Sequence, residues 1–590
     1  MPAVMHLFRR GFTALLALVL AIALGSCNLA EFKTDAAQIP QIVYSVLSDP
    51  KTFNAALSKE SPNIFSLTYE GLIDTNGLTG EVEPALAESW EISPDNLQII
   101  YTLREGLKWS DGEPLTADDV VFSYNQIYLN EEIPTNSRDS LRVGEKGEFP
   151  QVRKLDGRRI EFTVPEPFAP FLRATGLSIL PAHVLQAKVT TKDADGSPIF
   201  LSMWGTDTDP AEIIVNGPYQ LTSYTTSERV IFERNPYYWR QDQQGKAQPY
   251  IDRVIWQIVE STDNSLLQFR SGGLDLISVT PEYFSLLKRE DQRSNFTIYN
   301  GGPAPGTIFI SFNLNQGSRN GKPLVDPIKS SWFNTLEFRQ AVAYGLDRQT
   351  MVNNIYQGLG APQTSPISVQ SPYYTSPEEG LPTYDYNPEK AMTLLQQAGF
   401  KYDATGQLLD GAGNRVRFTL ITNSGNKIRE ALGAQIKQDL SKIGIKVDFQ
   451  PIAFNALVDK LSNTLDWDCH LIGFTGGIEP NNGANVWQPK GSLHAFNQTA
   501  LPGQPEIEGW KVADWEAEIG RLYTQGAQEL DEEKRKAIYA RTQYLAQEYL
   551  PFIYLINPLS MAAIRNKFAG LKYSALGGSL WNIHEIEIIE

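Results

Sequence analysis

Residues 83–121, EPALAESWEISPDNLQIIYTLREGLKWSDGEPLTADDVV, contain the densest group of local fold signals in this chain. Within them, residues 109–112 (WSDG) predict a turn, because the aspartate can bond the local backbone and the glycine tolerates a positive φ. Thr116 and Asp119 have the spacing of a capping box in front of an apolar stretch, which predicts the start of a helix. Trp109 is expected to pack in a hydrophobic core.

Farther along the chain, apolar residues change their period in the way that a β-α-β unit requires. They alternate with polar residues over 416–420, recur at helical spacing over 428–443, and alternate again over 445–449. Gly444 lies between the second and third segments and is expected to end the helix. This order predicts two strands joined by a helix.

A second unit of the same kind precedes it. Residues 254–259 predict a strand, residues 264–269 a short helix, and residues 274–279 a return strand after two glycines. Alternating strands and helices predict an α/β fold. No sequence period of about 20 to 50 residues recurs, so solenoids and propellers are disfavoured.

Two stretches look like connections between larger parts of the molecule. Residues 300–306 (NGGPAPG) are rich in turn formers, and residues 549–558 carry a proline near each end of an apolar run. A chain that leaves one lobe, builds another and returns creates a cleft between them. We therefore expect a hinge at these two stretches, about which the lobes close on a ligand.

Several motifs resemble those of the family 5 extracellular solute-binding proteins, the peptide and nickel group that serves ABC importers. Residues 83–121 resemble the family signature. Four more matches follow in the family's order: Gly217-Pro218-Tyr219, Asn235-Pro236-Tyr237-Tyr238-Trp239, the helix pair from Phe338-Arg339 to Asp347-Arg348, and Tyr386 to Phe400. We expect Asn235-Pro236 to end a strand and the three aromatic residues after it to pack beneath that strand. The resemblance covers roughly residues 40 to 560.

This resemblance implies an α/β, two-lobed periplasmic-binding-protein fold with an extra small domain on the first lobe and a hinged interlobe cleft. The predicted boundaries are 1–26 for a lipoprotein signal peptide, 27–40 for a tether, 41–80 and 201–302 for the first lobe, 81–200 for the small domain, 303–555 for the second lobe, and 556–590 for the C-terminal return to the first lobe.

In peptide-binding members of this family, an aspartate late in the second lobe meets the ammonium group of the peptide, in a segment reading like ADYxxP. The matching segment here is FTGGIEP, residues 474–480, which places Gly476 where that aspartate is expected. The usual anchor is therefore absent. Glu479 could replace it, as could Asp466 or Asp468 just upstream, and the alternative is that each is a solvated or turn acid.

The region 473–497 concentrates glycines, amides and aromatic side chains, which suits a binding loop better than a core strand. From it we predict six ligand-binding residues: Gly476, Gly477, Glu479, Asn481, Asn482 and Trp487.

The N-terminus reads as a signal peptide. Arg9 and Arg10 form a basic region, and residues 12–24 are an apolar run shorter than the roughly 20 residues that span a bilayer. Leu24-Gly25-Ser26-Cys27 resembles a bacterial lipobox, which implies that Cys27 is acylated and becomes the mature N-terminus. We expect a lipid-anchored protein at the periplasmic side of the cell membrane or the outer cell surface. The alternative is a plain secretory signal that ends at a chance cysteine.

Composition and charge narrow the function further. The chain has 590 residues, of which 42% are hydrophobic and 20% charged, as in ordinary soluble proteins of several domains. Its formal net charge of -17, without a basic run interleaved with aromatics, disfavours nucleic acid as a partner. Cys469 has no intramolecular partner after Cys27 is set aside, and its apolar surroundings predict a buried, inert thiol.

An enzyme would need a catalytic constellation, and the sequence offers none. The histidines outside the signal show neither metal-ligand spacing nor a nucleophile motif: His183, His470, His494 and His584. We therefore predict no metal, no cofactor and no catalysis, although paired carboxylates of a glycan hydrolase would be invisible in sequence.

The predicted function is capture of a small solute, by default short peptides, and its delivery to the permease subunits of an ABC importer by a monomer. The alternatives are a non-peptide solute such as an oligosaccharide, an opine or a metal chelate, and a lipoprotein that senses or scaffolds.

Overall fold

The computed structural model describes residues 39–60 and 63–589. The predicted signal peptide and Cys27 lie outside these residues. From residue 42 onward, the described residues form one compact unit, which contains the sheets and helices described below. Both helices and strands are abundant in it, as expected for an α/β protein.

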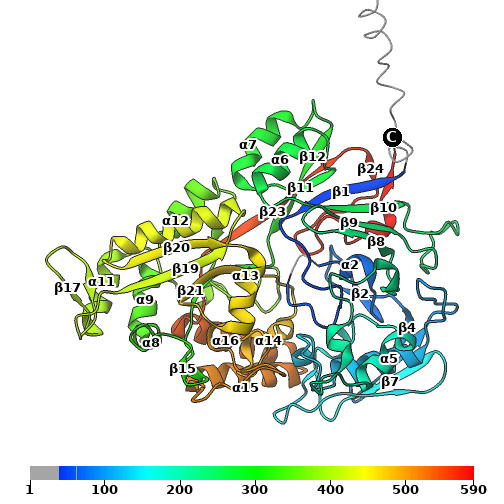
Figure 1. The fold of residues 1–590 in the computed structure, drawn as a ribbon, viewed down its shortest axis with the longest axis horizontal. Coiled ribbons are helices and arrows are strands. Elements are labelled where there is room, and N and C mark those ends of the chain that lie inside the picture. The colour runs from blue at the N-terminus through cyan, green and yellow to red at the C-terminus, as the bar shows by residue number, and fades with distance from the viewer. Residues whose placement is uncertain (1–38, 61–62, 590) are drawn as a thin grey trace, which may run out of the picture. The chain divides into compact units, whose positions relative to one another are not determined.

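The first lobe, as we use the term, is the part built around an eight-stranded sheet (Figure 1). The strands lie in the order β12 (Phe296–Pro303), β23 (Ile556–Arg565), β11 (Leu276–Ser278), β1 (Gln41–Val46), β10 (Arg253–Ile258), β9 (Arg229–Arg234) and β8 (Tyr219–Thr225), and β16 (Gly360–Pro362) pairs with β23. The sheet thus joins segments from both ends of the sequence.

The second lobe is the part built around a five-stranded sheet. Its order is β20 (Lys446–Ile452), β19 (Arg417–Asn423), β21 (Cys469–Phe474), β13 (Thr307–Phe312) and β22 (Ile553–Tyr554). The helix α12 (Lys427–Ser441) connects β19 to β20, and these two strands are parallel. The first predicted β-α-β unit is therefore confirmed, with its glycine stop at Gly444.

The second predicted unit also has the expected order of strand, helix and strand, but its two strands are not neighbours in the sheet. The segments form β10, α6 (Thr262–Arg270) and β11, close to the predicted bounds. However, β1 lies between β10 and β11 and pairs with β11 in parallel. The sequence of the unit could not reveal an inserted strand that comes from the N-terminal end of the described chain.

The small domain carries a four-stranded antiparallel sheet in the order β4 (Ala87–Ile92), β5 (Gln98–Leu103), β7 (Arg159–Thr163) and β6 (Gln151–Lys154). Thr116 and Asp119 form the predicted capping box at the start of α3 (Ala117–Phe122). Trp109 is fully buried, and its hydrophobic cluster continues into the sheet of the first lobe. The small domain and the first lobe therefore share one core.

The two predicted connections do join the two large sheets. The chain passes from β12 to β13 through residues 304–306 and returns from β22 to β23 through Leu555. Between these crossings, β16 reaches back to pair with β23 over Gly360–Pro362. The boundaries predicted for the lobes and the small domain remain a prediction.

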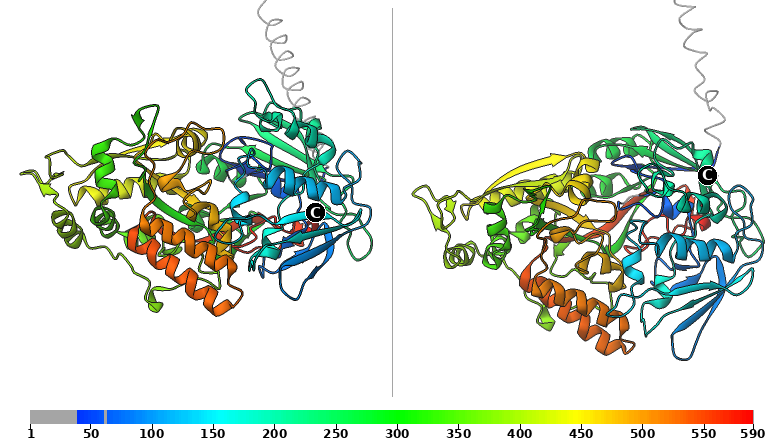
Figure 2. Two further views of the ribbon diagram at one scale, coloured as in Figure 1. Left: turned by 90° about the horizontal axis from the view of Figure 1, so that it is seen from below. Right: turned by 60° about the horizontal axis from the view of Figure 1, so that its bottom comes forward.

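Helices cover the sheets, and the longest belong to the second lobe. The remaining helices with at least eight residues are α5 (Ala182–Thr190), α7 (Pro281–Glu290), α8 (Pro327–Asn334), α9 (Leu336–Gly345), α11 (Pro388–Gln397), α15 (Asp514–Gln528) and α16 (Glu532–Tyr549). Figure 2 shows α15 and α16, in orange, side by side.

The aromatic residues after Asn235 do not all pack as predicted. Tyr238 is buried and Trp239 is half-buried, but Tyr237 is 41% exposed. The Asn235 side chain accepts a hydrogen bond from the backbone N–H of Tyr237. The resulting turn sends the Tyr237 ring outward, where the Lys108 ammonium lies 5.3 Å from its centre.

Candidate functional site

The strand β21 leads into the predicted binding loop and has one free edge there. Along its whole length it pairs with β13, from Thr307 opposite Phe474 to Phe312 opposite Cys469. On its other side, β19 pairs with it only at Cys469 and His470. The Thr422 hydroxyl of β19 also donates to the Leu471 carbonyl. Among the described residues, only the stretch 472–474 therefore has no paired strand on its outer side, where an extended ligand could bond its main chain.

Gly476 lies next to the crossing between the lobes. A Cβ atom at this position would overlap the carbonyl oxygen of Pro305. No aspartate fits here without a shift of the loop, which explains physically why the expected anchor is absent. At Gly477, by contrast, a Cβ atom would meet only the Asn482 amide, at 3.7 Å.

Glu479 is engaged in a buried ion pair. Its carboxylate lies 2.6 Å and 3.0 Å from the two terminal nitrogens of Arg535, and both side chains are about 95% buried. It also accepts a hydrogen bond from the Asn481 backbone N–H. Arg535 donates further to the carbonyl of Gly526 and to the Tyr373 hydroxyl. In this conformation Glu479 ties the loop to α16 rather than facing a solute.

The other predicted binding residues divide between the interior and the surface. Asn481 is buried and donates to the carbonyl of Ser140 in the small domain. Asn482 is exposed. Trp487 is buried and stacks on Tyr523 at 6.2 Å between ring centres, as part of the second-lobe core. The two upstream acids already have cationic neighbours, since Asp466 lies near Lys460 and Asp468 near Lys329.

Arg429 is a cation at the free edge that sequence reasoning missed. It lies in the first turn of α12, and one terminal nitrogen is 3.5 Å from where a Cβ atom on Gly473 would be. Its guanidinium donates to the Asn423 side chain, and no carboxylate among the described residues forms an ion pair with it. Burial lowers its pKa. The hydroxyl of nearby Tyr356 is buried without a hydrogen-bond partner in the described part of the chain.

The binding loop touches the first lobe at its tip. The Ile478 side chain lies 2.5 Å from where a Cβ atom on Gly80 would be, in the turn between β2 (Ile73–Thr75) and β3 (Val82–Pro84). Leu576, from the C-terminal segment, lies at the same point. Elsewhere, Gly425 before α12 packs on the Glu260 carbonyl before α6. The two lobes therefore meet on both sides of the β21 edge.

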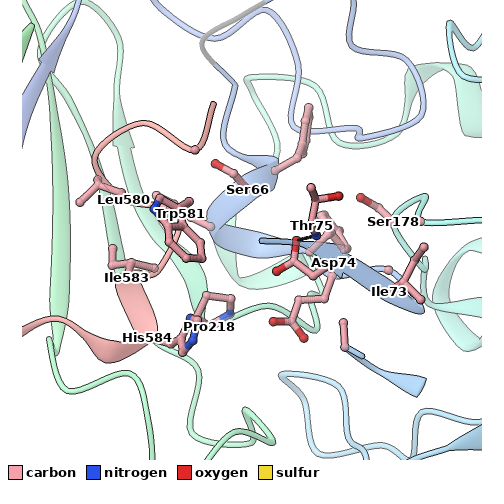
Figure 3. A pocket seen from close by; sticks show the side chains of 18 of the residues that line it. Ser66, Ile73, Asp74, Thr75, Ser178, Pro218, Leu580, Trp581, Ile583 and His584 are labelled. Atoms are coloured by element: carbon pink, nitrogen blue, oxygen red, sulfur yellow. Dashed lines mark hydrogen bonds between the residues drawn. The ribbon is translucent and has the colours of Figure 1, made fainter. Parts of the chain in front are cut away.

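A cavity of about 430 Å³ includes β2 and Gly577 in its walls, close in sequence to Gly80 and Leu576 (Figure 3). Its walls consist of Tyr44, Phe65, Ser66, Leu67, Tyr69, Glu70, Gly71, Ile73, Asp74, Thr75, Ala85, Gly176, Ser178, Pro218, Tyr238, Gly577, Leu580, Trp581, Ile583 and His584. All of these residues belong to the first lobe or the small domain. Trp581 and His584 lie on one side of the cavity, and Ile73 and Asp74 lie on the other (Figure 3).

A buried carboxylate lines this cavity, and a guanidinium lies beside it. Glu70 accepts hydrogen bonds from the Tyr238 hydroxyl and from the Trp239 indole N–H, the latter at 2.6 Å. The guanidinium of Arg240 lies 3.6 Å from the same carboxylate. Burial raises the pKa of Glu70, against the opposing effect of Arg240. Because both Glu70 oxygens already have donors, this group is largely satisfied by the protein itself.

Asp74 and His584 complete the ionisable lining. The Asp74 carboxylate accepts from the Thr75 backbone N–H and lies 3.8 Å from Arg240, beyond hydrogen-bond distance. Burial raises its pKa. Burial and Arg240 lower the pKa of His584 to about 4, so that its ring is neutral at pH 7.

The remaining chemistry-bearing side chains on β21 are buried in the core. Cys469 is free and fully buried, as predicted, and burial raises the pKa of its thiol. His470 is fully buried between Trp467 and Phe309, and neither ring nitrogen has a hydrogen-bond partner among the described residues. No group of three or more metal-ligating side chains in residues 39–60 and 63–589 could hold an ion. Likewise, none of the helices described there is both long and apolar enough to cross a membrane.

Comparison with known proteins agrees with this architecture. The sequence model described as "Bacterial extracellular solute-binding proteins, family 5 Middle" matches residues 81–494. A "Probable ABC transporter-binding protein" of Deinococcus radiodurans is 32% identical over 538 residues, which cover 86% of this chain and 85% of the relative.

Two solved structures share the fold. The oligopeptide-binding protein AppA from Bacillus subtilis, solved in complex with a nonapeptide, superposes with a TM-score of 0.77 at 23% identity over 93% of this chain and 99% of that one. The periplasmic binding protein MelB from Agrobacterium fabrum, in complex with stachyose, gives a TM-score of 0.80 at 20% identity over 93% and 84%. Since the family model spans more than half of the sequence, this chain belongs to the bacterial extracellular solute-binding proteins of family 5.

Proposed function

We propose that this protein captures short peptides between its two lobes and delivers them to an ABC importer. The observation that carries the proposal is the free edge of β21 at residues 472–474, close to places where the two lobes meet. An extended ligand on such an edge is held by main-chain hydrogen bonds, which every peptide offers regardless of its side chains. The nonapeptide bound by AppA and the name of the Deinococcus relative support this reading.

The groups around the edge suit a peptide with free ends. Arg429 supplies a guanidinium beside Gly473. The N–H donors of a guanidinium match the two oxygens of a carboxylate, such as the C-terminus of a peptide. Five residues farther along the chain, Ile478 touches the first lobe at Gly80.

Closure about the two crossings would enclose the solute. A solute that contacts both lobes stabilises the closed state by its differential affinity for that state. The closed form then docks on the permease, where opening releases the cargo. This role requires no catalysis, and we propose that the protein is a monomer without enzymatic activity or cofactor.

The peptide assignment can be tested with the purified protein. We expect at least one pool of unmodified peptides of two to nine residues to raise the melting temperature, because a ligand at 100 times its dissociation constant stabilises the folded state by about 2.7 kcal/mol. Oligosaccharide and opine pools are the matched comparison, since MelB carries stachyose on the same fold. If the melting temperature rises with these pools and not with peptides, the solute is not a peptide and the peptide assignment is wrong.

We also propose that Cys27 anchors the protein through lipid. The lipobox-like residues 24–27 support this, and they lie outside the described residues. With its native leader, wild-type protein is expected in the membrane fraction with an acylated N-terminal cysteine, whereas Cys27→Ala is expected to lose the lipid. Mass spectrometry of the N-terminal peptide decides the question, and an unmodified N-terminus in the wild type would refute the anchor.

A further inference from the structure

The first-lobe cavity lies at the meeting point of three parts of the chain. Thr75 in its wall directly precedes the turn 76–81, in which Gly80 is touched by Ile478 of the second lobe. The loop around Ala575 and Gly577 packs on Gly301 in β12, directly before the crossing, and Ala575 donates to the Gly301 carbonyl. The cavity therefore adjoins the proposed peptide site, although the second lobe contributes none of its lining residues.

The electrostatics of the cavity favour a positively charged guest. Two carboxylates, Glu70 and Asp74, face one fixed cation, Arg240, while His584 is neutral at pH 7. Both oxygens of Glu70 already accept hydrogen bonds. The Oδ2 atom of Asp74, 3.8 Å from Arg240, accepts no hydrogen bond from the described residues, and this side chain is about half-exposed. It is thus an acceptor with spare capacity.

The indole ring of Trp581 forms a wall of the cavity on the side opposite Asp74. A Cβ atom on Gly77 would overlap the ring of Trp581, and one on Gly577 would lie 2.5 Å from it. Glycine at both positions lets the indole lie against the backbone. Its hydrogen-bonding N–H points away to the carbonyl of Lys572. The Lys572 ammonium lies 6.0 Å from the centre of this ring and is paired with Glu585. Aromatic faces attract cations, so the ring offers an organic cation a surface opposite Asp74.

We propose that this cavity binds an organic ammonium group, with Asp74 as its anionic partner and Trp581 as its aromatic wall. In a peptide this group is the free N-terminus or a basic side chain. Asp74 then supplies from the first lobe the anchor that Gly476 does not supply from the second. This inference rests on the proposed peptide function only in naming a peptide as the molecule that carries the ammonium group. A small amine would fill the same cavity.

The test titrates wild type, Asp74→Asn and Trp581→Leu with three probes: trialanine to hexaalanine with free N-termini, the same peptides N-acetylated, and n-butylamine. Asp118→Asn is the matched control, since Asp118 is exposed on the small domain and pairs with Lys154 there. Free-amine peptides are expected to bind wild type roughly 10- to 100-fold more tightly than Asp74→Asn, the cost of one charged hydrogen bond. N-acetylation is expected to cause a similar loss in wild type and little further loss in Asp74→Asn.

The outcomes separate the two proposals. If free and acetylated peptides bind equally well to wild type and to Asp74→Asn, the ammonium site is wrong and peptide capture stands. If no peptide binds but n-butylamine binds wild type and not Asp74→Asn, the ammonium site stands and peptide capture falls. If neither amine probe depends on Asp74, the inference is overturned. Circular dichroism of each variant confirms that the fold is retained.

Discussion

Arg535→Met is expected to lower the free energy of unfolding by about 3–5 kcal/mol, because it leaves the Glu479 carboxylate buried without its counter-charge. The loss includes the hydrogen bonds from Arg535 to Gly526 and Tyr373. Since Glu479 holds the loop on α16, solute affinity should fall together with stability. Urea titration followed by tryptophan fluorescence measures the first effect, and the binding assay described above measures the second.

The control for this prediction lies on the same helix. Arg541 is 47% exposed and pairs with Glu518 at 3.3 Å, and such surface pairs contribute about 0–1 kcal/mol. Arg541→Met should therefore change the free energy of unfolding very little. The double variant Arg535→Met with Glu479→Leu should recover most of the stability, because it removes the stranded charge. A double variant as unstable as the single one would show that the buried carboxylate is not the cause.

Acid is expected to destabilise the protein through His470. Burial lowers the pKa of His470 to about 3, against an ordinary value of 6.5. As pH falls through this window, the unfolded chain takes up the proton before the folded one does. The stabilising contribution of the neutral ring is complete above pH 6.5 and is lost progressively toward pH 3, by up to about 4–5 kcal/mol. Melting temperatures from pH 8 to pH 4 should show this loss.

Two replacements isolate the titration of this side chain. His470→Phe fits between Trp467 and Phe309 without a group that needs a proton, and His470→Gln keeps polarity without titrating. Both variants should lose less stability than wild type as the pH falls, and their pH profiles should be parallel even if their stabilities at pH 8 differ. A wild-type profile that parallels both variants would mean that His470 does not control acid stability.

Local signals predicted the local structure well. The capping box at Thr116, the β-α-β unit around α12, and the two crossings all depend on residues close together in sequence, and all were found where predicted. The insertion of β1 between β10 and β11 was not predictable, because nothing within the unit records which distant strand lies between its members. The prediction that Tyr237 packs beneath the strand was wrong for a related reason. The turn at Asn235 determines which of the three adjacent rings faces inward.

The candidate site was predictable in outline only. The loop after β21 could be identified from its glycines and amides. The sequence could not show that Glu479 forms an ion pair with Arg535, 56 residues away. The cavity was missed entirely. Asp74 and Trp581 are separated by most of the chain, and neither lies in a motif that assigns it a role. Only the fold reveals that they face each other.

The walls of the cavity are complete without the second lobe, so the proposed ammonium site predicts how capture divides between association and dissociation. An amine that binds there meets its partners before the second lobe arrives, so the encounter rate depends on Asp74 and the access to its cavity. In the proposed mechanism, the edge of β21 and the contact of Ile478 would act after closure and would therefore control the residence time. Substitutions in the first lobe should then change mainly the association rate, and those along β21 mainly the dissociation rate.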